Sequence, residues 1–509
     1  MATVDSSQII RITNSDGGTW INVPSGGGAP GANTEVFLQG VASVGKRLSN
    51  VTDTGFAFDG GSGVNFTGRH VGVWVFFLHY AAMTALKGIL VTDASNYGRF
   101  NVFDTTTNKY PALGGWVRLW VNVDLAPSSQ VGTFNKESVR YFGIQLSVPA
   151  VGSGNAANVF IDAIDYTTGG LILTGTSGVF QDFVTADENT SNKYGIIISN
   201  AGVIYCFGRL ILGTATSLVF NDSNFVVVFP NQPTVASNFM GISVDLSHTN
   251  TDIVWEKGVI RSAGAVKGDL IVTGTSGSFS ITNSSLSGLR LITLTSKPVL
   301  TGCLISSSGL INASGASLLG CTIIESTSSP ALLWDVNVNT NSKLDGTQFI
   351  SAGSGHAIEL GTNCPSEITL TDVTFSNYGA NATADAAIFN NSGKAITINI
   401  SGGTSPTVLN GSGASTVVND AVTLTIAANI SLSGAEVRIY DLNASGNNLG
   451  TELDGVESNS GTTFPFSGSA GNEIWIQIMK DGYEEFGQSV TMPSINSTLT
   501  VILKSDINI

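Results

Sequence analysis

The chain has 509 residues with a formal net charge of −15; 12% of the residues are charged, 42% are hydrophobic and 60 are glycine. An acidic chain lacks the basic patches that neutralise phosphates, so nucleic-acid binding is excluded as its main role. A chain of this length is expected to form about two to four domains. Because so few residues are charged, Ser, Thr, Asn and Gly must cover much of the surface.

The first segment, 1–166, contains strand-like runs at 71–78, 116–123, 139–148 and 158–166. Period-two alternation in 116–123 indicates a half-buried antiparallel strand, and several such runs predict a β-sandwich. The runs 141–146 and 159–164 resemble the last two strands of jelly-roll carbohydrate-binding modules. That resemblance implies a jelly-roll-like domain used for docking or for carbohydrate binding.

The same segment holds the longest apolar stretch, 71–91. It contains His79, Tyr80, Thr84 and Lys87, so we predict two buried strands and no membrane insertion. The chain opens without a basic start followed by an apolar run, so no secretory signal is expected.

The second segment, 167–415, repeats a short strand-turn phrase with apolar first positions. These first positions are Trp255, Ile281, Leu300, Leu318, Leu344, Leu370 and Ile396, in steps of 26, 19, 18, 26, 26 and 26 residues. The third position is usually a residue that tolerates the left-handed backbone region: Asn283, Gly302, Gly320, Gly346 or Asp372. Such a period marks a solenoid, and the absence of a helical stripe predicts a right-handed parallel β-helix. A β-sandwich with coincidental turn spacing is the alternative.

The third segment, 416–509, alternates apolar and polar residues between Gly and Asn turns, which predicts a small antiparallel sandwich. Its strand Ala435-x-Val437-x-Ile439 and the later Lys480-x-Gly482-Tyr483 resemble carboxypeptidase-regulatory-like domains. The resemblance implies an Ig-like, transthyretin-like fold that serves adhesion or assembly. The expected fold class is therefore all-β throughout.

The order of sandwich, β-helix and small Ig-like domain resembles the surface proteins of tailed-bacteriophage virions. The resemblance implies a non-enzymatic structural protein, a tail fibre, spike or head decoration, assembled in the host cytoplasm and carried on the virion. It also implies a homotrimer whose partners are other capsid or tail proteins and a host-surface glycan. A tailspike-type polysaccharide depolymerase and a bacterial surface adhesin are the alternatives.

Because β-helices also host polysaccharide-cleaving enzymes, we examined the acidic residues as candidate catalytic groups. They are Asp245, Asp252 and Glu256 on one early turn, Asp182, Asp187 and Glu188 in an irregular excursion, and Glu325, Asp335, Asp345, Glu359 and Asp372 later. No two of the later acids share a column on adjacent turns, so the sequence predicts no catalytic pair.

Metal and cofactor chemistry is not expected either. The histidines, His70, His79, His248 and His356, form no HxH or HExxH pattern. The cysteines, Cys206, Cys303, Cys321 and Cys364, lack zinc-ligand spacing. Cys303 and Cys321 occupy the same position of adjacent turns, and we expect core thiols there, with a disulfide as the alternative. The seven tryptophans could stack on sugars, but packing roles are expected for them.

Overall fold

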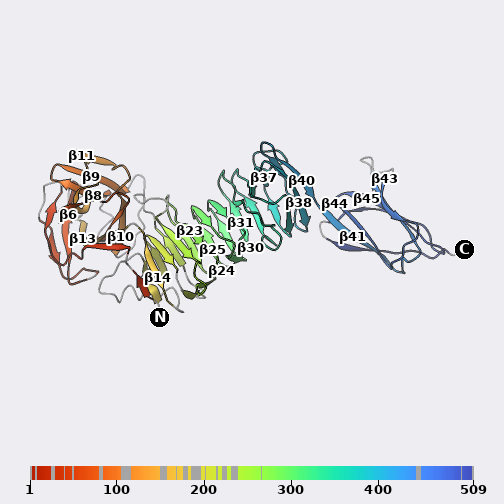
Figure 1. The fold of residues 1–509 in the computed structure, drawn as a ribbon, viewed down its shortest axis with the longest axis horizontal. Coiled ribbons are helices and arrows are strands. Elements are labelled where there is room, and N and C mark those ends of the chain that lie inside the picture. Colours follow the sequence, from red (N-terminus) through yellow and green to blue (C-terminus); the bar gives the residue numbers. More distant parts are fainter. Residues whose placement is uncertain are drawn as a thin grey trace. The chain divides into compact units, whose positions relative to one another are not determined.

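In the computed structural model, almost all of the regular secondary structure among the described residues is β-strand (Figure 1). It describes residues 3–5, 8–23, 29–38, 40–48, 51–78, 84–104, 116–148, 157–167, 169–175, 182–184, 197–200, 202–213, 216–220, 226–230, 239–264, 266–442, 449–469, 471–493 and 496–506. Two compact units are formed by Met1–Val299 with Cys303–Ile311, and by Leu300–Gly302 with Asn312–Ile509. The three-domain division expected from the sequence cuts the chain elsewhere and stays a prediction.

The N-terminal sandwich consists of two antiparallel six-stranded sheets. One has the order β10(Trp116–Asn122)-β7(His70–Leu78)-β13(Ala157–Thr167)-β5(Ser43–Leu48)-β4(Gly31–Asn33), with β2(Ile9–Thr13) also on β13. The other has the order β11(Ser129–Val131)-β9(Asn96–Asp104)-β8(Ala85–Asp93)-β12(Val139–Val148)-β6(Val51–Val64)-β3(Trp20–Asn22).

These strand orders are those of a jelly roll. Strands β5, β13, β7 and β10 are neighbours in one sheet, while β6, β12, β8 and β9 are neighbours in the other. The chain therefore passes back and forth between the sheets as two Greek keys, which is the jelly-roll topology. The predicted jelly-roll-like sandwich is confirmed.

The apolar stretch 71–91 falls largely on β7 and β8, which lie in different sheets of this sandwich. Val73, Trp74, Val75, Leu86 and Ile89 are buried in it. The prediction of two buried strands is confirmed. Among the described residues, no helix has the length and apolarity that crossing a membrane requires.

The solenoid has three faces whose successive turns pair as parallel strands, apart from one antiparallel pair at the start of each of two faces, and this confirms the predicted β-helix (Figure 1). Face 1 has the order β1(Thr3–Asp5), β14(Leu171–Thr174), β17(Arg209–Leu212), β20(Gly241–Asp245), β23(Asp269–Thr273), β26(Leu291–Thr293), β29(Leu310–Asn312), β32(Leu332–Trp334), β34(Ile358–Leu360), β37(Ile388–Asn390), β39(Val408–Asn410). Face 2 has the order β15(Ile197–Asn200), β16(Val203–Cys206), β19(Val226–Phe229), β22(Val259–Ser262), β25(Ser285–Ser287), β28(Leu304–Ser306), β31(Thr322–Glu325), β33(Gln348–Ser351), β36(Thr374–Ser376).

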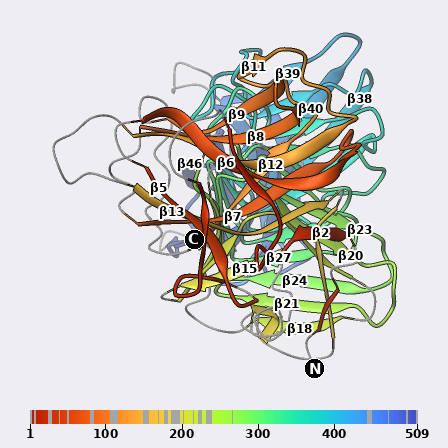
Figure 2. The same cartoon turned by 90° about the vertical axis from the view of Figure 1, so that its left-hand side faces the viewer.

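Face 3 consists of two shorter sheets. The first is β18(Ser217–Phe220), β21(Asp252–Glu256), β24(Ser278–Thr282), β27(Val299–Thr301), β30(Ser317–Leu319), and the second is β35(Glu367–Thr371), β38(Ala395–Ser401), β40(Ser415–Asn419). Figure 2 shows β18, β21 and β24 lying in successive layers. Alternate residues of each strand point inward; in β21, for example, Ile253 and Trp255 are buried. Each turn thus adds one layer to a continuous apolar core.

The corner between faces 3 and 2 follows the repeated phrase. Its third residue has a positive φ in each of the first six copies, at Lys257 (54°), Asn283 (48°), Gly302 (61°), Gly320 (58°), Gly346 (69°) and Asp372 (53°). Only the left-handed backbone region gives so sharp a change of direction, and Gly, Asn and Asp reach it with least strain. The predicted role of this position is confirmed, with Lys257 as an unexpected member.

The seventh copy of the phrase was placed four residues too early. Leu370 pairs with Ile400, and the corner glycine is Gly402, with φ of 77°. The expected first position, Ile396, pairs instead with Thr416 of the next turn. Ile396, Ile398 and Ile400 are all buried. A shift of four residues keeps the same side chains inward, so the apolar pattern alone cannot fix the register.

The jelly roll packs against the first turns of the solenoid through aromatic rings, all within the first compact unit. The ring of His70 stacks on Phe239 with centroids 3.9 Å apart. Trp120 meets the same Phe239 edge-on at 5.2 Å, and Trp74 meets Phe207 at 6.3 Å. We call these five residues the aromatic junction. Both tryptophans and Phe207 are fully buried.

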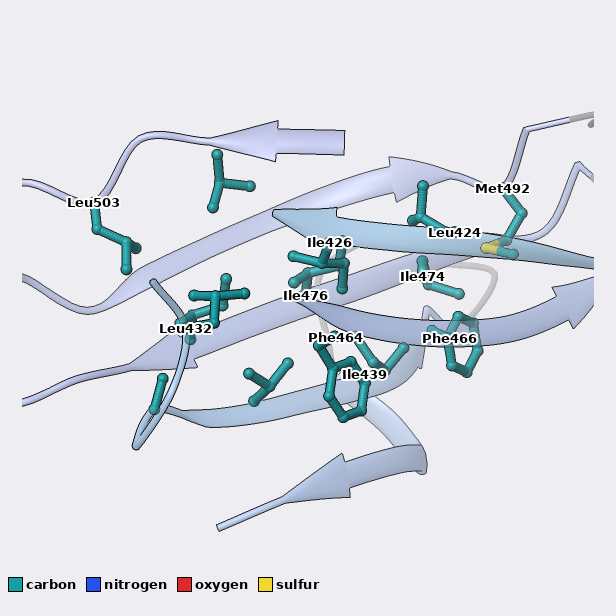
Figure 3. Close-up of a cluster of buried hydrophobic side chains, with 14 of the residues drawn as sticks. Leu424, Ile426, Leu432, Ile439, Phe464, Phe466, Ile474, Ile476, Met492 and Leu503 are labelled. Atoms are coloured by element: carbon teal, nitrogen blue, oxygen red, sulfur yellow. The ribbon is translucent and has the colours of Figure 1, made fainter. Parts of the chain in front are cut away.

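The C-terminal sandwich has seven strands in two sheets. They are β44(Phe464–Ser469)-β41(Ala421–Ala428)-β47(Ser497–Val501) and β43(Leu449–Val456)-β42(Glu436–Leu442)-β45(Glu473–Met479)-β46(Phe486–Thr491). Strand β47 runs parallel to β41, and the other pairings are antiparallel. Figure 3 shows the apolar core between the sheets, where Ile426, Ile439, Ile476 and Phe464 come together. The expected small Ig-like or transthyretin-like sandwich is consistent with this layout.

Candidate functional site

Most of the candidate acids have local structural roles. Asp245 accepts a hydrogen bond from the Ser247 amide at 2.9 Å, and Asp252 accepts one from the Ser278 hydroxyl. Asp345 accepts one from the Ser342 amide at 3.0 Å. Asp372 is a corner residue with φ of 53°. These contacts stabilise turns and need no ligand to explain them.

The three acids of the early turn do not form a cluster. Asp245 ends a face 1 strand, whereas Asp252 and Glu256 lie on face 3. In the neighbouring turns Asp252 pairs with Ser217 and Ser278, and Glu256 pairs with Thr282. Asp182 is exposed, while Asp187 and Glu188 lie outside the described residues.

Glu325 points into the solenoid interior. It is 2% exposed and stacks on Ser351 of the next turn. Its carboxylate accepts hydrogen bonds from the Thr327 amide at 2.7 Å and the Ser351 hydroxyl at 3.1 Å. Burial raises the pKa of the Tyr378 hydroxyl, and the negative charge of Glu325 raises that pKa further. Glu325 therefore makes structural hydrogen bonds at a buried position and does not belong to an open site.

Two of the predicted acids, Asp335 and Glu359, come together on the outer surface of face 1. Leu333 pairs with Glu359, Glu359 with Phe389, and Phe389 with Leu409, so these four form one outward column. Asp335, Gly361, Asn391 and Gly411 follow directly after the same strands and form the adjacent column. We call these eight residues the face 1 patch; all of them lie in the second compact unit.

Asp335 and Glu359 are diagonal neighbours in this patch, one turn and one column apart. Strand spacing and residue rise put their backbones about 8 Å from each other. Carboxyl pairs in glycosidases are separated by roughly 5–10 Å. A comparison of acids within one column does not reveal this pair, because its two members lie in adjacent columns.

Glycine makes room for the Asp335 carboxylate. A Cβ atom on Gly361 would lie 2.4 Å from Asp335 Oδ1, closer than real side chains come. The amide of Asn363 donates a hydrogen bond to the same oxygen at 2.7 Å. On the other side, Asn391 Nδ2 donates to Glu359 Oε1 at 2.8 Å. The two acids are thus held by partners from the next turns.

An aromatic pair borders the acids. The half-buried ring of Phe389 stacks on His356, with centroids 5.0 Å apart and planes 26° apart. His356 Nδ1 lies 2.6 Å from the carbonyl oxygen of Ala386. Since a carbonyl only accepts, this nitrogen must carry the proton. This hydrogen bond fixes the imidazole in its stacked position against the Phe389 ring.

The remaining predicted groups do not join the patch. His70 belongs to the aromatic junction, His248 accepts a hydrogen bond from the Asn250 amide at 3.1 Å, and His79 lies outside the described residues. Trp74, Trp120, Trp255 and Trp334 are fully buried, as expected for packing roles. No group of three or more His, Cys, Asp or Glu placed to hold a metal occurs among the described residues.

The cysteines are buried thiols, as expected. Burial raises the pKa of the Cys206 and Cys364 thiols to about 12. A thiol of such high pKa forms almost no thiolate near neutral pH, and the thiolate is the nucleophile. Nucleophilic chemistry at these two positions is therefore disfavoured.

No family model matches this chain, and no curated protein matches its sequence. Among solved structures, it is similar to the crystal structure of the Agl-KA catalytic domain, with 11% identity over 81% of this chain and 86% of that chain and a TM-score of 0.28. It is also similar to the catalytic domain of a GH87 alpha-1,3-glucanase in complex with nigerose, with 11% identity over 84% and 88% of the two chains and a TM-score of 0.20. Scores this low transfer no activity to this protein.

Proposed function

We propose that this protein is a structural component of a bacteriophage virion surface, an appendage of the tail or the head that takes part in assembly and in attachment to the host. The aromatic junction carries the proposal. Trp74 and Trp120 are both fully buried, and Trp120 meets Phe239 at 5.2 Å. Because close-packed side chains are hard to compress, this contact joins the jelly roll to the solenoid rigidly. A terminal domain fixed to a β-helix suits an appendage that must hold its direction.

Cryo-electron microscopy of purified particles tests the proposal, with antibody labelling against this chain to identify the density. Density on the capsid lattice would identify a decoration protein, and density at the tail would identify a fibre or spike. Absence of the chain from infectious particles would overturn the proposal and favour the surface-adhesin alternative.

We further propose that the chain forms homotrimers through face 2. On strands β22, β25 and β28 of the first unit, the outward residues of this face are Val259, Arg261, Ser285, Ser287, Leu304 and Ser306. In the second unit they are Thr322, Ile324, Gln348, Ile350, Thr374 and Ser376. Only Arg261 among these is charged. Removing such a surface from water costs less than burying a charged one, which favours contact between copies.

Solution mass tests the trimer. Sedimentation of the full chain at micromolar concentration should give three times its mass of 52.7 kDa. Ile350→Glu places a charge on face 2, where Ile350 is half-buried and points outward, and should shift the mass to one chain. Val417→Glu, which changes an exposed residue on face 3, is the control. A wild-type mass of one chain contradicts the proposal.

A polysaccharide depolymerase is the second candidate, and the diagonal placement of Asp335 and Glu359 favours it. Their backbones lie about 8 Å apart on one surface, a spacing that lets two carboxyl groups approach the same glycosidic bond. The test is release of reducing ends from host-envelope polysaccharide. Hydrolysis that both Asp335→Asn and Glu359→Gln abolish would establish the enzyme. Hydrolysis unchanged in both variants, or no release at all, would reject this site as its source.

A further inference from the structure

We infer that the face 1 patch binds a neutral sugar residue of a polysaccharide. The inference rests on the proposed attachment function and deepens it, because it names the surface and the chemical class of the ligand. Three features of the patch support it: an aromatic ring held by stacking on a second ring, hydrogen-bonding groups beside it, and negative charges that disfavour acidic sugars.

The ring of Phe389 supplies an apolar surface on which a sugar can lie. It points outward between Glu359 and Leu409 of the neighbouring turns. His356 of the preceding turn stacks on it with the ring centroids 5.0 Å apart and is itself hydrogen-bonded to the Ala386 carbonyl oxygen. Side chains held in this way lose little conformational freedom when a ligand binds. The C–H face of a pyranose ring is apolar and can pack on such a ring.

Glu359 and Asn391 supply hydrogen bonds beside the ring. Asn391 Nδ2 already donates to Glu359 Oε1 at 2.8 Å, which orients both groups. A carboxylate only accepts, whereas an amide both donates and accepts. The pair therefore matches vicinal hydroxyl groups, which donate and accept in turn. Asn391 is exposed, so the pair is open to solvent.

Glycine residues leave the adjacent column with few side chains that project from the surface. Gly361 and Gly411 alternate there with Asp335 and Asn391. A Cβ atom on Gly411 would lie 3.2 Å from Asn391 Oδ1 and in ordinary contact with the Phe389 ring, so a side chain at this position would press on the Asn391 amide. A chain of sugars lying along the solenoid axis would meet these glycines beside the ring. The ligand is thus expected to span more than one turn.

The charges of the patch select the kind of sugar. Asp335 and Glu359 are both acidic, and the chain as a whole carries −15. A uronate or sulfate group placed between two carboxylates would be repelled at short range. The ammonium group of Lys394 donates to the Thr362 carbonyl oxygen at 3.1 Å, close to the patch. Sialic-acid and uronate polymers are therefore expected to bind more weakly, and neutral hexose polymers are the expected ligands.

A glycan array carrying neutral and uronate-containing oligosaccharides, probed with the full-length protein, tests the inference. We expect binding to neutral hexose oligomers and at least tenfold weaker binding to uronate oligomers. Phe389→Ala should weaken binding to the neutral oligomers at least tenfold, whereas Phe389→Tyr keeps the ring and should stay within threefold of wild type. Absence of neutral-glycan binding, or binding unchanged in Phe389→Ala, would overturn the inference.

Face 3 offers a matched control for the acid. Glu367 accepts a hydrogen bond from Asn399 Nδ2 at 2.7 Å, the same arrangement as Glu359 with Asn391 on another face. Glu359→Gln should weaken binding several-fold, and Glu367→Gln should leave it unchanged. Equal losses in the two variants would show a general structural effect and would reject the site. Thermal unfolding of each variant identifies any that fail to fold, and the Tyr and Gln variants then decide the outcome.

The two proposals fail in different ways. Neutral-glycan binding by a chain that is absent from particles would overturn the virion function and leave the binding site standing. Presence on particles without any glycan binding would keep the structural role and remove the site.

Discussion

The two sandwiches of this chain both have an apolar core, but they differ in where they place charge. The jelly roll also buries an ion pair: Arg118 and Asp165 are both 0% exposed and form this pair, which Arg11 joins. The Arg118 guanidinium lies 5.4 Å from the centre of the Trp74 ring and 4.6 Å from that of Trp120. In the C-terminal sandwich the ion pairs around Arg438 lie at the surface.

This difference shows which of the two sandwiches requires one specific arrangement of its buried groups. A buried ion pair adds little net stability compared with apolar packing, but it penalises any arrangement that separates its partners. The jelly roll places its pair behind Trp74 and Trp120, the tryptophans of the aromatic junction. Its charges therefore fix the surface that meets the solenoid. The C-terminal sandwich contains no such pair among its described residues and relies on interchangeable aliphatic side chains.

The largest expected effect comes from breaking the buried pair. Asp165→Asn keeps the shape of the side chain but leaves Arg118 in the core without its counter-charge. Loss of one partner of a buried pair costs about 3–5 kcal/mol. Hydrogen exchange of the full chain, followed by mass spectrometry, should show this loss in jelly-roll peptides, with peptides from 421–509 unchanged. A loss below about 1 kcal/mol would contradict the role given to the pair.

A cavity in the C-terminal sandwich should reduce stability slightly less than loss of the buried ion pair. This reduction should appear in the C-terminal sandwich and not in the jelly roll. Ile476 is 0% exposed at the centre of the C-terminal core. Ile476→Ala should cost about 2–5 kcal/mol. The same exchange measurement should place the loss in peptides from 421–509 only. Ile476→Val is the graded control, with an expected cost of about 1 kcal/mol.

The pH dependence of stability should also distinguish the two regions. Burial, as the main cause, lowers the pKa of His70 from 6.5 to about 4, with Arg209 lowering it and Asp124 raising it. Between these values the unfolded chain takes up a proton that the folded chain does not. Stability is therefore lost as the pH falls from 6.5 to 4, by at most about 3 kcal/mol.

This loss should appear in the jelly roll and not in the C-terminal sandwich, whose sequence contains no histidine. His70→Phe keeps a ring against Phe239 and removes the titrating group. Chemical denaturation at pH 6.5 and 5 should show a smaller difference in this variant than in the wild type. An equal difference in both proteins would show that other groups control the acid sensitivity.

The smallest effect is expected at the surface of the C-terminal sandwich. Arg438 donates to Glu452 at 2.8 Å and to Glu436 at 2.9 Å. Glu452 is well exposed, and ion pairs of this kind contribute little because water and salt screen them. Glu452→Gln should leave the melting temperature within measurement error at physiological salt. A shift comparable to that of Ile476→Ala would contradict the contrast between the regions.

Much of the fold could be predicted from the sequence because it depends on local rules. Corner positions such as Asn283 and Asp372 need a left-handed backbone, and few residue types supply it. The strand-like run at 139–148 is matched by β12, which the structure places at the same residues. The register at Ile396 was wrong because the apolar pattern repeats every two residues over three isoleucines. Only contacts with the next turn decide between such registers.

The candidate site was missed although the repeat could have aligned its residues. Leu318 and Leu344 begin successive copies of the phrase 26 residues apart, and Leu333 and Glu359 are also 26 residues apart, so the repeat itself aligns them on face 1. The phrase lies at the corner between faces 3 and 2, so it does not show which side chains of face 1 point outward. The structure shows that Glu359 does, and that Asp335 follows the strand of Leu333 and so lies diagonally beside it.

The first strand has a consequence for the biosynthesis of this chain. Strand β1 is antiparallel to β14, so Thr3 meets Thr174. A ribosome adding about 5–20 residues each second makes the partner roughly 10–30 s after the strand itself has emerged. During that time β1 must wait while the jelly roll between it and β14 is made. Strand β1 therefore closes the edge of face 1 only after its partner has been synthesised, which ties the order of folding to the order of translation.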